Sequence, residues 1–178
     1  MFAGKALKRS VFSVRVAVWR VAIFVLGLIQ VSTAFASGTI GYGSRQGMEV
    51  SVISMEGVDT SHAVIHTRHT RENAIAFCDA FADVRPDKDA CIREELATPL
   101  NDVISANCTT GEFTDFYGNH YRFLGLNRRE GDPARPKYAV LNLSNREIAD
   151  GTTSSGYPTN ILIFGALCPS QAPLPFDQ

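Results

Sequence analysis

The densest group of side chains that could do chemistry lies in residues 66–73, with the sequence HTRHTREN. Arg68, His69, Thr70 and Arg71 stand where an apolar stretch ends and a helix is predicted to begin. The first backbone amides of a helix lack partners within it and carry the positive end of its dipole, so they bind anions well. These four residues are therefore a candidate site for a phosphate, a sulfate or an acidic group of a partner. The alternative is an ordinary capped helix start whose arginines are solvated or pair with nearby acids.

The spacing of His66, His69 and Glu72 also resembles that of a metal-binding set. However, His66 belongs to a predicted strand and Glu72 to a predicted helix, so the three side chains do not share a face. The four cysteines are too far apart for a zinc site, which uses close pairs such as C-x2-C. We therefore expect neither a metal nor a cofactor.

A second group of acid–base residues, Asp115, His120 and Arg122, lies around a predicted hairpin. His120 and Arg122 share one face of a strand by the two-residue period, and Asp115 could oppose them across the turn. A general base with a cationic stabiliser could be built from such residues. A small hydrolase or transferase that uses His69, His120 and nearby acids is thus one alternative function. The solvent face of a hairpin explains the same residues equally well, and no nucleophile elbow or phosphate loop accompanies them.

A set of seven aromatic residues lies in the predicted hairpins and at the start of the predicted last helix. They could form a stacking surface for a sugar or a peptide, although such residues more often fill a small core. The set comprises Phe113, Phe116, Tyr117, Tyr121, Phe123, Tyr138 and Tyr157.

The start of the chain is typical of a secretory signal. It has basic residues without acidic ones, an apolar run over residues 21–29, and the sequence Ala34-Phe35-Ala36. The run is shorter than the roughly 20 residues that a spanning helix needs, and a longer anchor would have to bury Arg20. We therefore expect residues 1–36 to be removed and the protein to be periplasmic or secreted, without a stable membrane anchor.

The rest of the chain has the size of one domain with a real core. Without the five basic residues of the signal, 12 basic residues face 18 acidic ones, a net charge of −6. Nucleic-acid binding is disfavoured, because such proteins gain affinity from surplus Lys and Arg. We expect a flexible lead-in over residues 37–47, a single globular domain over 48–169 and a disordered tail over 170–178.

Hydrophobic spacing predicts the elements of this domain. Alternation indicates strands at 49–55 and 62–67. Thr70 suits the N-cap of a helix, whose apolar stripe is Ala74, Phe77, Cys78 and Phe81. A second helical stretch, with a kink or restart at Thr98-Pro99, carries Cys91, Ile92, Leu96, Leu100, Val103 and Ile104 on its inner face.

The second half reads as two hairpins and a helix. The hairpins are predicted at residues 113–124 and 137–149, the latter with a two-residue turn at Ser144-Asn145. Pro158 then opens a last helix that ends at Cys168.

The four cysteines, Cys78, Cys91, Cys108 and Cys168, indicate two disulfides in an oxidising compartment, with three possible pairings. The layout favours Cys78–Cys91, which would join consecutive helices, and Cys108–Cys168, which would pin the last helix to the start of the sheet. Segregated strands and helices indicate the α+β class. We expect an antiparallel sheet of two hairpins plus an N-terminal strand pair, with a helical hairpin and a C-terminal helix, stapled by two disulfides.

Three blocks together resemble a group of small exported bacterial proteins that have a similar arrangement of cysteines and no assigned activity. The blocks are HTRENAIAFC (His69–Cys78), CTTGEFTDFYGNHYRFLG (Cys108–Gly125) and ADGTTSSGYPTNILIFGALCP (Ala149–Pro169). The resemblance implies a periplasmic or secreted protein and supplies no catalytic residue.

The interpretation that fits these features is a non-enzymatic binding domain of the periplasm or cell envelope, with an envelope protein or polymer as partner. Besides the small hydrolase or transferase, a secreted enzyme inhibitor remains an alternative. The sequence indicates neither the ligand nor the oligomeric state.

Overall fold

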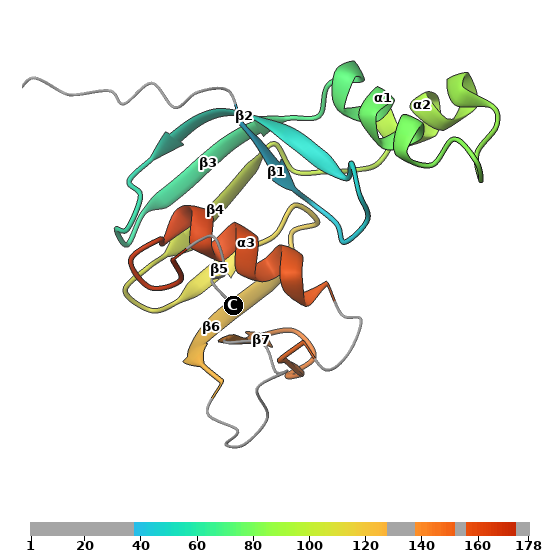
Figure 1. The fold of residues 1–178 in the computed structure, drawn as a ribbon. Coiled ribbons are helices and arrows are strands. Elements are labelled where there is room, and N and C mark those ends of the chain that lie inside the picture. Colours follow the sequence, from blue (N-terminus) through green and yellow to red (C-terminus); the bar gives the residue numbers. More distant parts are fainter. Residues whose placement is uncertain (1–37, 128–137, 152–155, 174–178) are drawn as a thin grey trace, which may run out of the picture. The chain divides into compact units, whose positions relative to one another are not determined.

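An eight-stranded antiparallel sheet and a C-terminal helix dominate the part of the chain that the structure describes (Figure 1). This computed structural model describes residues 38–127, 138–151 and 156–173. The strands are neighbours in chain order, from β1 to β8. The elements are β1 (Thr39–Gly41), β2 (Glu49–Glu56), β3 (Ala63–Arg68), α1 (Arg71–Ala80), α2 (Lys88–Leu96), β4 (Val103–Asn107), β5 (Glu112–Thr114), β6 (His120–Leu126), β7 (Tyr138–Asn142), β8 (Ile148–Ala149) and α3 (Tyr157–Leu167). The predicted α+β class is confirmed, with its antiparallel sheet, helical hairpin and C-terminal helix.

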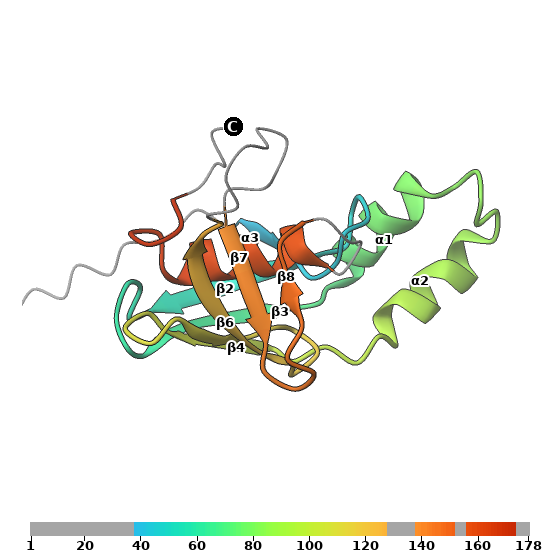
Figure 2. The ribbon, with the colours of Figure 1, turned by 90° about the horizontal axis from the view of Figure 1, so that it is seen from below.

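Helix α3 occupies the centre of the main core. Its side chains Ile161, Ile163, Phe164 and Leu167 are fully buried, and the helix contacts β1, β3, β4 and β7. In Figure 2, β7 and β8 cross in front of α3 while β3 and β4 run beneath it. A helix that is apolar on several faces must be covered on several sides, and a sheet that bends around it provides that cover.

Helices α1 and α2 form a smaller second cluster. Helix α1 begins at the predicted N-cap, where the Thr70 hydroxyl accepts the backbone N–H of Asn73 and the side-chain Oδ1 of Asn73 accepts the backbone N–H of Thr70. This reciprocal cap satisfies two amides that a helix start would otherwise leave open. The residues buried between the helices are Ala74, Phe77, Cys78, Cys91 and Ile92.

Both predicted disulfides are present. Cys78–Cys91 joins α1 to α2, and Cys108–Cys168 joins the loop after β4 to the end of α3. All four cysteines are at most 2% exposed, so each bridge lies inside one of the two clusters.

The predicted second helix is too long. Helix α2 ends at Leu96, and Val103 and Ile104 lie in β4. Ile104 is fully buried whereas Val103 is 44% exposed, which is the alternation of a strand with one face in the core. The spacing of Leu96, Leu100 and Ile104 fits a helical stripe by coincidence, and pairing with β3 decides the outcome.

The predicted two-residue turn at Ser144-Asn145 is also wrong. The N–H of Asn142 donates to the carbonyl of Glu147, so residues 143–146 all lie in the turn. Arg146 takes a positive φ of 64°, which lets the chain reverse over this longer connection.

Two predicted boundaries of the domain need correction. The expected flexible lead-in contains β1, which pairs with β2, and Tyr42 is only 3% exposed. At the other end, the amide and hydroxyl of Ser170 donate to Asp59, and Ala172 is fully buried. The expected disordered tail is therefore anchored up to Ala172, and residues 174–178 lie outside the described part.

The expected signal, residues 1–36, also lies outside the described residues. Among the residues that the structure describes, no helix is long and apolar enough to cross a membrane.

The two disulfides should contribute unequally to stability. They close loops with sequence separations of 13 and 60 residues, and in the chain-entropy model the free energy of unfolding rises by about 3 and about 4 kcal/mol respectively. Replacing Cys108 and Cys168 together by serine should therefore lower the urea midpoint more than replacing Cys78 and Cys91. Equal or reversed losses would show that native packing, not loop closure, sets the contribution of the bridges.

Candidate functional site

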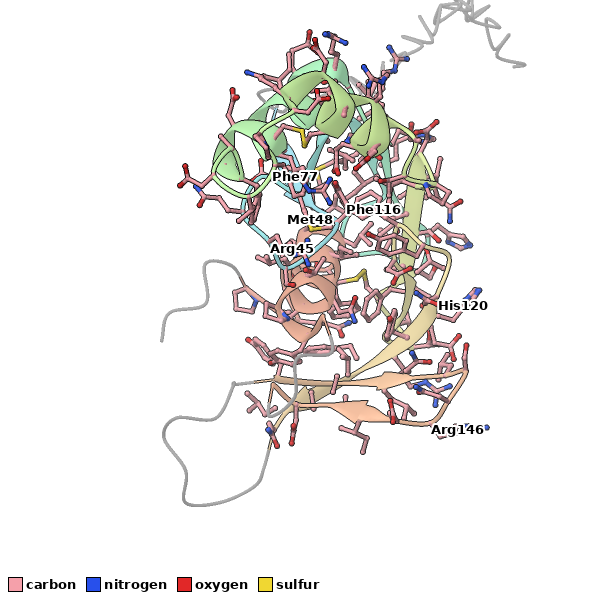
Figure 3. The ribbon with its side chains drawn as sticks, turned by 90° about the vertical axis from the view of Figure 1, so that its right-hand side faces the viewer. Arg45, Met48, Phe77, Phe116, His120 and Arg146 are labelled. Atoms are coloured by element: carbon pink, nitrogen blue, oxygen red, sulfur yellow. A yellow bond between two sulfur atoms is a disulfide. The ribbon has the colours of Figure 1, made fainter. Side chains whose placement is uncertain are left out.

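A cleft of about 490 Å³ opens between four separate parts of the chain. Its walls are the loop after β1 (residues 42–48), three side chains of the α1–α2 hairpin, the β5–β6 turn (residues 115–121) and the first turn of α3 (residues 156–160). We call it the tyrosine cleft, because Tyr42, Tyr117 and Tyr121 all line it. Figure 3 shows Arg45, Met48 and Phe77 grouped on the side where the loop after β1 approaches α1. The volume lies in the range of small-ligand sites.

Gly47 brings this loop close to α1. It has a φ of +79°, and a Cβ at this position would lie 2.8 Å from the Cα of Phe77. Both the backbone conformation and the close approach require glycine. The neighbouring Arg45 and Met48 are thereby placed on the cleft wall.

One wall of the cleft is held by Asp115. Its Oδ1 accepts the backbone N–H groups of Tyr117 and Asn119, and its Oδ2 accepts the side-chain amide of Asn119 and the hydroxyl of Tyr121. Asn160 of α3 also hydrogen-bonds to Tyr121. The carboxylate thus fixes the β5–β6 turn and keeps Tyr117 and Asn119 at the cleft.

Tyr42 and Glu95, which line the cleft, form a buried polar cluster with His69. Nε2 of His69 is 3.8 Å from Oε1 of Glu95, and the two side chains are 10% and 9% exposed. The rings of Tyr42 and His69 are in contact, with centroids 5.5 Å apart. The Tyr42 hydroxyl, both His69 nitrogens and Oε1 of Glu95 are covered from solvent without a hydrogen-bond partner among the described residues.

Burial changes the proton affinity of this cluster. It raises the pKa of Glu95 and lowers the pKa of His69, because both charged forms lose hydration. Burial, followed by the nearby charges of Glu95 and Asp115, also raises the pKa of Tyr117. Perturbed groups that border a cleft are typical of functional sites.

The structure divides the four residues of the predicted anion site. Arg68 and Arg71 are exposed, while His69 turns inward towards Glu95. The amide of Asn73 is bound by the Thr70 hydroxyl, and hydrogen bonds from its own amide and from Thr70 lower the pKa of the Glu72 carboxylate. The chain's own oxygen atoms thus occupy the helix start, and anion binding by Arg68, Thr70 and Arg71 stays a prediction.

The second predicted group is not assembled. Asp115 lines the tyrosine cleft, whereas His120 borders a different hollow and in Figure 3 points away from the side on which Arg45, Met48 and Phe77 lie. Arg122 forms an exposed ion pair with Glu112, with Nη2 2.6 Å from Oε1. The hairpin therefore presents His120 and Arg122 to solvent, as the structural explanation expected.

Tyr42 and Glu95 were missed in the sequence. Tyr42 falls in a glycine-rich stretch without periodicity, and Glu95 looks like one more surface acid of a charged helix. A usable signal was the position of Glu95, which follows the buried Cys91 and Ile92 by four and three residues and so shares their face.

Comparisons with known proteins add no relative. Neither protein families, nor curated proteins, nor solved structures gave a match to this chain. The resemblance to small exported bacterial proteins stays a prediction.

The buried cluster makes a pH-dependent stability prediction. The pKa of Glu95 is raised in the folded protein, so the folded state binds this proton more tightly than the unfolded state does. The contribution of Glu95 to the free energy of unfolding is therefore highest at low pH, where Glu95 is protonated, and it falls as the pH rises from the ordinary pKa of 4.5 through the raised pKa. Glu95→Gln should therefore raise the free energy of unfolding at pH 7 by about 1 kcal/mol, which urea denaturation would show as a higher midpoint than that of wild type. The gain should disappear near pH 4, where wild-type Glu95 is protonated.

Glu94→Gln is the matched control. Glu94 is exposed and paired with Arg85, so its loss should leave stability unchanged or lower it by less than about 1 kcal/mol. A Glu95→Gln protein that is less stable than wild type at pH 7 would contradict the assignment of Glu95 as an unpartnered buried acid.

Proposed function

We propose that this protein is an exported, non-enzymatic binding domain whose tyrosine cleft takes up a small ligand of the periplasm or cell envelope. The observation that carries the proposal is the polar cluster of Tyr42, His69 and Glu95 at the cleft wall. Each buried polar group without a partner costs about 1–3 kcal/mol of folding free energy. Proteins commonly accept such costs at sites that serve function, where stability and activity compete.

The size and chemistry of the cleft support the same proposal. Ligand sites combine apolar and aromatic walls with a few placed polar groups, and here Met48 and Phe77 face the cleft together with Glu95 and Asn119. The four walls come from segments that two disulfides and the main core hold in place. Such a preformed site loses little entropy when a ligand binds.

A cleft-blocking variant tests the proposal. Ser44 is exposed and lines the cleft, so Ser44→Trp should fill its mouth without disturbing the core. A thermal-shift screen with sugars, amino acids, short peptides and nucleotides should find a ligand that stabilises wild type. At 100 times its Kd, that ligand should add about 2.7 kcal/mol to the free energy of unfolding.

Ser44→Trp should abolish this stabilisation, while Ser144→Trp, in the exposed β7–β8 turn, should retain it. Equal ligand stabilisation in both variants would place the site elsewhere, and the absence of any ligand would reject the proposal.

Export rests on the basic and apolar start of the chain, and the two disulfides support it because such bonds form in oxidising compartments. We expect the exported form to begin at Ser37. The intact mass of protein from a periplasmic fraction checks this, and an uncleaved chain in the membrane fraction would contradict it.

A hydrolase is the second candidate, favoured by the His69–Glu95 pair beside the cleft. Glu95 with a raised pKa could donate a proton, and His69 could orient it. In that case Glu95→Gln would abolish turnover and leave ligand binding intact, which separates this function from simple binding.

A further inference from the structure

The charges around the tyrosine cleft nearly cancel. Arg85 is paired with Glu94, with Nη1 3.0 Å from Oε2, and Asp115 is engaged in four hydrogen bonds. The charged residues that line the cleft are two arginines, Arg45 and Arg85, and two acids, Glu95 and Asp115, so their formal charges sum to zero. A strongly charged ligand would meet no surplus of opposite charge here, so the cleft suits a neutral, polar molecule.

The polar side chains at the cleft are mostly planar groups with two terminal atoms. Glu95 offers a carboxylate whose Oε1 has no hydrogen-bond partner among the described residues, and Arg45 offers a guanidinium fork. The side-chain amide nitrogen of Asn119 donates to Asp115, which leaves its amide oxygen as an acceptor. A carboxylate and a guanidinium can each bind two neighbouring hydroxyls, and a hydroxyl both donates and accepts. The mixture of donors and acceptors therefore matches a row of vicinal hydroxyls.

An aromatic ring completes the arrangement. Tyr117 lies at the cleft and is 48% exposed, and its ring meets that of Tyr42 edge-on, with centroids 6.5 Å apart. The other aromatic residues of the β5–β6 hairpin are more deeply buried, and Phe113 and Tyr121 stack with each other. Tyr117 thus keeps about half of its surface exposed beside the planar polar groups, and the C–H face of a sugar ring can stack on its ring.

We propose that the ligand of the tyrosine cleft is a neutral carbohydrate, one or two rings of an envelope or extracellular glycan. Tyr117 stacks on a ring face, and Glu95, Asn119 and Arg45 bind its hydroxyls. This inference rests on the proposed binding function and names its ligand class.

The test uses the purified exported protein, a panel of neutral and charged mono- and disaccharides, and isothermal titration calorimetry. A neutral sugar should bind, and its ring-opened alditol, which keeps the hydroxyls but lacks a ring face, should bind much more weakly. Tyr117→Ala should weaken sugar binding roughly tenfold, the upper range for one aromatic contact. Tyr117→Phe should retain affinity because it keeps the ring.

Two further variants separate the cleft from the rest of the surface. Glu95→Gln should weaken binding because one acceptor becomes a donor. In contrast, His120→Ala, which lies outside the cleft and points away from it (Figure 3), should bind like wild type. Sugar binding that is insensitive to Tyr117→Ala and Glu95→Gln would overturn the inference.

The outcomes also distinguish this inference from the binding function itself. If no sugar binds but an amino acid, peptide or nucleotide binds and is lost in Ser44→Trp, the carbohydrate assignment fails and the binding function stands. If no class of ligand binds, both fail.

Discussion

Burial of helix α3 is the interaction on which the rest of the described structure depends. The sheet has two open edges, at β1 and β8, and its inner face is apolar over most of its strands. Neither a sheet of this kind nor a helix as apolar as α3 is stable when exposed, because each leaves a large hydrophobic area in water. Packing them together resolves both problems, and Cys108–Cys168 makes the contact covalent.

The tyrosine cleft exists because the described residues pack into two separate clusters. The main core includes the sheet and α3 from its first turn onward, and the α1–α2 hairpin forms a smaller cluster of its own. Met48 contacts both clusters, and the space between them is the cleft. A binding site at the junction of two packed units draws residues from both without disturbing the interior of either.

The features that could be predicted from the sequence are those with a local cause. Thr70 caps a helix because its hydroxyl reaches an amide three residues away, and that spacing is visible in the chain. The disulfide pairing followed from the order of the elements. Val103 and Ile104 were wrongly assigned to a helix. They form a strand because they pair with β3, which lies 35 or more residues earlier, and the local sequence does not show this pairing.

The polar cluster at the cleft could not be predicted for the same reason. His69, Tyr42 and Glu95 belong to three segments that meet only after the sheet has formed. Sequence spacing grouped His69 instead with its neighbours Arg68 and Arg71, and grouped Asp115 with His120. Arg68 and His69 are adjacent in the chain, and Asp115 is adjacent to Thr114, the register partner of His120. Neighbouring positions of an extended chain point to opposite sides of the backbone, so Arg68 and His69 are separated, as are Asp115 and His120.

Helix α3 follows all eight strands in the chain, and this order determines when the core can form. The first strands are made well before the helix that covers their apolar face, so a growing chain has nothing to close its sheet upon. Domains ordinarily fold as units once their whole sequence is accessible, and here the last eleven-residue helix is indispensable to that unit. A growing chain therefore cannot complete its main core until α3 has been made. For the same reason, a chain whose translation stops before α3 would leave the apolar inner face of the sheet exposed.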